Sequence, residues 1–169
     1  MSSHAAQFIS GELGKRKGVT TELIDIAELH LITDDAGEDA KDPRFSAAME
    51  RADALVIVTP EYNHSFPGLL KHVLDTCLKE YIHKAAGIVG VSAGAFGGTR
   101  VIEHFQPVLR ELGLVSIFWD VNFGNVATVF DSNGKLLDTA YVRRADKFLG
   151  ELIWMAKVLR HGREHIALE

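Results

Sequence analysis

The chain has 169 residues, of which 47% are hydrophobic and 24% charged, and its formal net charge is −5. A chain of this length suits one sizeable core, so residues 1–169 are expected to form a single domain. The negative balance argues against a nucleic-acid surface and against an anionic membrane as partners.

The cysteine and histidine content limits the chemistry further. Cys77 is the one cysteine, which excludes an intramolecular disulfide and a cysteine-based metal cluster. No metal site is predicted, because His64, His72, His83 and His104 show no i, i+4 pairing with a carboxylate ligand set. Neither a membrane-spanning run nor a signal peptide is recognisable, so the expected location is the cytoplasm.

The first part of the chain predicts a helix, a strand and a second helix. Ser2 or Ser3 is the expected N-cap of the first helix, which ends near Gly14 or Gly18. Residues 19–26 alternate like a strand, and residues 34–41 form an acidic loop. The next helix begins at Asp42-Pro43 and runs to about Ala52. The first of these helices is predicted because its apolar residues recur at helical spacing: Ala5, Phe8, Ile9 and Leu13.

The rest of the chain continues the alternation. Residues 54–58 are a continuous apolar run, typical of a strand buried on both faces. In chain order there follow a helix over 67–81, a strand over 88–91, a helix from Gly98 to about Leu112 ended by Gly113, a strand over 115–119, a turn at 131–134 and a helix over about 140–160. This order predicts an α/β fold with a parallel sheet and helices on both faces.

Ligands of such sheets bind beyond the carboxyl ends of the strands, where this sequence has two unusual loops. Thr59–Gly68 contains Pro60, which fixes the backbone, Tyr62, which can border a planar ring, and Asn63, which offers a donor and an acceptor. The second loop, Ser92–Arg100, contains three glycines. These allow close backbone approach to a ligand, or serve turn geometry alone.

Taken together and in order, the two loops resemble the NADPH-dependent FMN reductase family. The matching motifs are Pro-Glu-Tyr-Asn at 60–63, Pro-Gly-x-Leu-Lys at 67–71 and Ser-x-Gly-x-x-Gly-Gly at 92–98, and the resemblance covers about residues 3–160. It implies a flavodoxin-like three-layer fold with strand order 2-1-3-4-5 that holds FMN. NADPH or NADH would be the hydride donor, and quinones, azo dyes, metal oxyanions or free flavin the acceptors. A homodimer or homotetramer is also implied.

The resemblance assigns binding residues but no catalytic residue. No proton donor is required, because the flavin ring accepts hydride and can be protonated from solvent. Glu61 as a general base is less favoured than Glu61 capping backbone amides or facing a neighbouring subunit. The implied cofactor-binding residues are Ser3 at the end of the phosphate loop, Pro60, Glu61, Tyr62 and Asn63 beside the isoalloxazine ring, and Ser92, Gly94 and Gly97 on the second loop.

The beginning of the chain departs from the family pattern. Members start with a buried strand and a loop that holds the FMN phosphate, whereas Met1 to Ser3 here match the end of that loop. In the order 2-1-3-4-5 the unmatched strand lies inside the sheet. The hypothesis is that Met1 is an internal methionine and that the native protein is longer by about 10–15 residues. The rival hypothesis is a truncated or degenerate, non-enzymatic paralogue.

A serine hydrolase is the remaining alternative. Residues 90–94 fit Gly-x-Ser-x-Gly at a strand-to-helix turn, which would make Ser92 a nucleophile. His161 follows in the required order, although it falls within a predicted helix and the chain is short for that fold. Candidates for the acid are Asp120, Asp131 and Asp138.

Overall fold

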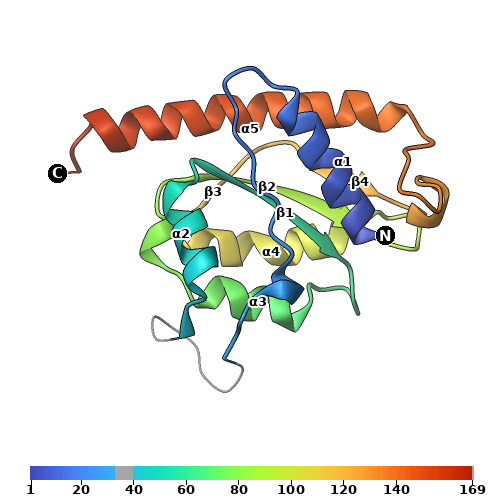
Figure 1. Cartoon of the computed structure of the whole chain (residues 1–169), viewed down its shortest axis with the longest axis horizontal. Coiled ribbons are helices and arrows are strands. Elements are labelled where there is room, and N and C mark those ends of the chain that lie inside the picture. Colours follow the sequence, from blue (N-terminus) through green and yellow to red (C-terminus); the bar gives the residue numbers. More distant parts are fainter. Residues whose placement is uncertain (33–39, 169) are drawn as a thin grey trace.

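A parallel sheet lies at the centre of the protein with helices on both faces (Figure 1). This computed structural model describes residues 1–32 and 40–168. β1 (Ala54–Pro60) pairs with β2 (Ala85–Val91), and β2 also pairs with β3 (Val115–Ser116) and β4 (Val121–Phe123), always in parallel. The predicted α/β architecture is confirmed, and the strand sequence agrees with the last three positions of the expected order.

Two layers of helices bury the sheet. On one face, α2 (Pro43–Arg51), α3 (Gly68–Asp75) and α4 (Thr99–Glu111) form one apolar core with β1 and β2. On the other, α1 (Ser2–Gly14) and the long α5 (Ala140–His165) form a second core. Every residue of β2 is buried, as a central strand covered on both faces requires.

The predicted strand over residues 19–26 is wrong. The segment has no strand structure and leads into a 3₁₀ turn, Ile26–Glu28, where the Asp25 side chain accepts from the Ala27 amide at 3.0 Å. A strand needs a neighbour to bond, and alternation alone supplies none. Here a groove of about 540 Å³ lies between residues 22–28 and β1.

Several predicted boundaries also require correction. Met1, rather than Ser2 or Ser3, is the N-cap of α1, and no side chain caps it. α3 ends at Asp75 and not at residue 81 as predicted. A separate 3₁₀ turn, Lys79–Tyr81, follows it. The strand expected over 115–119 ends at Ser116, and the sequence reading missed β4.

Other local predictions are confirmed. The Asp42 carboxylate accepts from the amides of Arg44 and Phe45 at 2.9 and 3.0 Å, so α2 begins where predicted. Hydrogen bonds from backbone amides lower the pKa of Asp42 below its ordinary value, and the bond from the His30 amide has the largest effect. Gly113 has φ 73° just after α4, and Gly134 has φ 80° in the predicted turn.

Most of the predicted acidic loop lies outside the described residues. None of the described helices has the length and apolar character to cross a bilayer.

Candidate functional site

The two loops singled out in the sequence meet at the carboxyl edge of the sheet. Pro60 and Val91, the last residues of β1 and β2, are register partners. The Glu61 amide donates to Val91 O at 2.9 Å, and the Ser92 amide donates to Phe123 O at 3.0 Å. Loops that are distant in sequence are thus held side by side by the ends of β1, β2 and β4.

The first loop makes a tight turn after Glu61. The amides of Tyr62 and Ser65 each donate to the other's carbonyl at 2.9 Å. Asn63 and His64 between them have φ of 50° and 68°, as a type I′ turn requires, and asparagine tolerates this region well. The Tyr62 side chain is 62% exposed, so the turn presents an aromatic ring at the edge of the sheet.

The second loop is a glycine cradle. A Cβ on Gly97 would lie 2.7 Å from Asn122 Cβ, and one on Gly98 would lie 2.8 Å from Gly90 Cα. Both glycines also have positive φ, so this loop cannot pack against β2 and β4 with larger residues. Among the described residues, the amides from 93 to 98 have no hydrogen-bond acceptor. Residues 93–96 are also exposed, so their amides form a row of donors available to a ligand.

Ser92 shapes this loop from within. Its hydroxyl donates to Gly94 O at 2.8 Å. The Asn125 amide donates to the same carbonyl at 2.9 Å. Ser92 and Gly94, both predicted site residues, are therefore held in one fixed turn.

An ion pair links the two loops. Arg100 Nη1 donates to Glu61 Oε1 at 3.2 Å, and the guanidinium lies 4.7 Å from the centre of the Phe96 ring. The Glu61 side chain is only 9% exposed, and its Oε2 is buried without a hydrogen-bond partner among the described residues. Sequence reasoning did not assign Arg100 a role. The available signal was an arginine as the last residue of the glycine loop.

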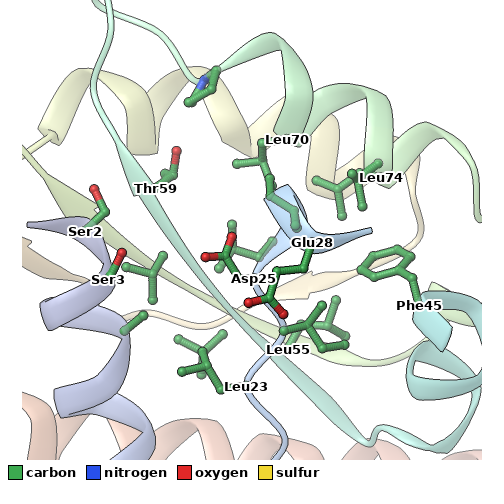
Figure 2. Close-up of a pocket in the computed structure, with 18 of the residues that line it drawn as sticks. Ser2, Ser3, Leu23, Asp25, Glu28, Phe45, Leu55, Thr59, Leu70 and Leu74 are labelled. Atoms are coloured by element: carbon green, nitrogen blue, oxygen red, sulfur yellow. The ribbon is translucent and has the colours of Figure 1, made fainter. Parts of the chain in front are cut away.

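Ser3 lies at the same edge but on another element. Figure 2 shows Ser2 and Ser3 at the start of α1, near Thr59 at the carboxyl end of β1. All three line the groove beside β1. Because the first amides of a helix have no partner within it, the start of α1 offers donors and a partial positive charge to an anion.

The hydrolase alternative is not supported by this geometry. The carbonyl of His83 and the carboxylate of Asp53, just before β2 and β1, accept hydrogen bonds from Arg163 at the end of α5. His161 therefore lies at the amino edge of the sheet, whereas Ser92 follows the carboxyl end of β2. The seven residues of β2, roughly 20 Å at 3.3 Å per residue, separate the two edges.

Comparison with known proteins gives a consistent result. The family model described as NADPH-dependent FMN reductase matches residues 1–128. An NAD(P)H-dependent FMN reductase of Pseudomonas aeruginosa is 34% identical over 129 residues, covering 72% of this chain and 70% of that protein. A quinone reductase of Pseudomonas putida is 32% identical over 126 residues, covering 69% and 68%. The flavoenzyme NAD(P)H:(acceptor) oxidoreductase FerB of Paracoccus denitrificans shares the fold with a TM-score of 0.74 at 22% identity, covering 93% of this chain and 90% of that one.

Proposed function

The chain belongs to the NADPH-dependent FMN reductase family, and from this premise we propose that it binds FMN at the carboxyl edge of its sheet and reduces a quinone with electrons from NAD(P)H. The NAD(P)H-driven flavin oxidoreductase activity follows from the family. The observation that supports this placement is the glycine cradle, whose unbonded amides lie at the same edge of the sheet as the Tyr62 turn.

The residues at this edge fit the two ends of FMN. A planar ring with several carbonyl and nitrogen acceptors suits the row of exposed amides from 93 to 96. The exposed Tyr62 ring, with Pro60 and Asn63 beside it, would border the isoalloxazine. A phosphate suits the start of α1, where Ser3 adds a hydroxyl to the free amides.

When bound, FMN supplies the redox chemistry, taking hydride from the nicotinamide and giving electrons to the acceptor. The chain's own residues position it. Ser92 and Gly97 fix the shape of the cradle, while the Arg100–Glu61 pair holds the first loop against it. We assign no residue to proton transfer.

The finer properties are part of the same proposal. Quinones are favoured as acceptors because two relatives of similar identity are named as quinone reductases; azo, metal-oxyanion and flavin acceptors are the alternatives. Residues 1–169 are proposed to form one flavodoxin-like domain, because α5 packs on the same core as α1 and β4. A cytoplasmic homodimer or homotetramer completes the proposal.

Titration of FMN fluorescence tests the assignment of Tyr62. Replacing Tyr62 by alanine removes an aromatic contact of about 1–1.5 kcal/mol, so the Kd for FMN should rise roughly tenfold. Trp154→Ala is the matched control, because Trp154 is a similarly exposed aromatic residue, 60% against 62%, but lies on α5. NADPH oxidation with benzoquinone should follow the occupancy of FMN. A parent chain that binds no FMN would favour the non-enzymatic paralogue.

A further inference from the structure

Two histidines lie on the exposed side of α5, close to its end. His161 and His165 are four positions apart, so they lie one helical turn from each other on the same face. Both are exposed, and their imidazole rings are stacked, with the ring centres 4.4 Å apart and the planes inclined by 18°. Two histidines of one helix bind the same zinc ion at this spacing. Neither is among the four histidines on which the prediction of no metal site was based.

The His165 ring is already held as a metal ligand requires. Its Nδ1 lies 3.0 Å from the carbonyl oxygen of His161. Because a carbonyl oxygen can only accept, Nδ1 carries the proton and donates it, which leaves the lone pair of Nε2 free. Metal-binding histidines fix their ring and their tautomer by such a bond. Within residues 1–32 and 40–168, no group forms a hydrogen bond with the His161 ring, so its nitrogens are also free.

The charged neighbours of the pair are engaged elsewhere or screened. Arg160 and Arg163 donate to the Asp53 carboxylate at 3.2 and 2.6 Å. At about 100° per residue, these arginines lie on the side of α5 away from the two histidines. Arg160 Nε also donates to Glu164 at 2.7 Å, so this carboxylate neutralises an arginine and is not assigned to the metal. Lys157, one turn before the first histidine, is exposed, and solvent ions screen its charge.

We propose that His161 and His165 chelate one zinc ion through their imidazole nitrogens, with water completing the tetrahedral shell. Two nitrogens at about 2.1 Å from zinc in this geometry are about 3.4 Å apart, so the stacked rings need only a small rotation toward each other. In the part of the chain that the structure describes, no group of three His, Cys, Asp or Glu side chains could hold a metal. Structural zinc sites have four protein ligands, so this two-ligand site binds zinc reversibly.

Isothermal titration of the chain with zinc chloride tests the site. The parent chain should bind one Zn²⁺, and H161A and H165A should each raise the Kd about tenfold or more, because each removes one of two protein ligands. His104→Ala is the matched control and should leave the Kd unchanged, since His104 is also an exposed histidine of a helix, α4. A parent chain that binds zinc no more tightly than H161A would overturn the proposal. One zinc ion per two chains would overturn the single-chain chelate.

A change of spacing separates chelation from binding by one histidine. H165A/I166H keeps eight histidines in the chain but moves the second of the pair to an exposed position beyond the last residue of α5. It no longer lies one turn from His161, so the variant should bind zinc as weakly as H165A. Equal zinc affinity of the parent chain and H165A/I166H would overturn the chelate.

Cu²⁺ is a second probe, because imidazole binds it as well. At a substoichiometric concentration of Cu²⁺, the EPR spectrum of the parent chain should show two nitrogen ligands, and that of H165A/I166H one. A spectrum with one nitrogen ligand in the parent chain would also overturn the proposal. Both measurements are independent of FMN, because His161 lies at the amino edge of the sheet and the proposed flavin site at the carboxyl edge.

Discussion

Replacing Arg100 by methionine tests how the two ligand-facing loops are held together. An exposed ion pair contributes only about 0.2–1 kcal/mol, and the Arg100 side chain is 41% exposed. Its partner Glu61 is only 9% exposed, with one carboxylate oxygen already unbonded. Removing the cation leaves a largely buried charge unpaired, which costs about 1–3 kcal/mol. We therefore expect R100M to lower the free energy of unfolding by about 1–3 kcal/mol.

A double-mutant cycle separates the pair from the general effect of each substitution. Glu61→Gln removes the charge but keeps the shape, so the second substitution, R100M, should cost less in this background. The coupling free energy should be about 1 kcal/mol, measured by urea unfolding of the four proteins. Lys157→Met is the control, since it also removes one positive charge but at an exposed position of α5.

FMN titration shows whether the pair matters for the site. If the pair fixes the separation of the loops, R100M should raise the Kd for FMN about tenfold, a loss of roughly 1.4 kcal/mol, and K157M should leave it unchanged. Additive unfolding energies together with an unchanged Kd would refute the reasoning. In that case the pair would be a surface contact without influence on the loops.

Three further substitutions test the cradle, the phosphate end and a half-buried carboxyl group, Asp120. Gly98→Ala would place a Cβ 2.8 Å from Gly90 Cα at a residue whose φ is 80°. It should therefore lower the free energy of unfolding by about 2–4 kcal/mol. Gly150→Ala is the control and should not lower it, because Gly150 has open space around it. Ser3→Asp should weaken FMN about tenfold by repelling its phosphate and leave riboflavin, which has none, unaffected; loss of both would contradict the placement. Burial, and then the charge of Glu103, raise the pKa of Asp120 to about 6. Between pH 4 and pH 7 the folded chain therefore binds a proton at Asp120 that the unfolded chain has lost, so the free energy of unfolding should fall by about 1–2 kcal/mol over this range. Urea unfolding should show that D120N lacks this decrease.

The sequence predicts the parts of the fold that depend on local chemistry. Asp42-Pro43 starts α2 as expected, and Gly113 and Gly134 have positive φ, as the predicted helix end and the predicted turn favour. The apolar run at 54–58 forms a strand as predicted, although only the odd-numbered residues of β1 are fully buried and the predicted burial on both faces is not reached. Each of these predictions rests on a residue whose conformational preference is strong in any context.

Predictions that depended on a distant partner were less accurate. Apolar and polar side chains alternate along residues 19–26, but this segment pairs with no neighbouring strand among the described residues. It therefore does not form a strand. The strand at 115–119 breaks after Ser116, where the Phe118 amide bonds Glu151 of α5 at 3.0 Å instead of β2. Arg100 was missed for the same reason, since its partner Glu61 is 39 positions away.

The two halves of the proposed FMN site rest on different supports. The ring half is built on the ends of β1, β2 and β4, and β2 is buried along its whole length. The phosphate half is built on α1, whose buried residues, Ala5 and Ile9, pack on the core shared with α5. On its other side α1 borders the groove beside β1, which Ser2 and Ser3 line together with Thr59. A change in the position of α1 should therefore affect binding of the phosphate far more than binding of the ring. This difference makes the preference for FMN over riboflavin the property that reports on the phosphate half of the site.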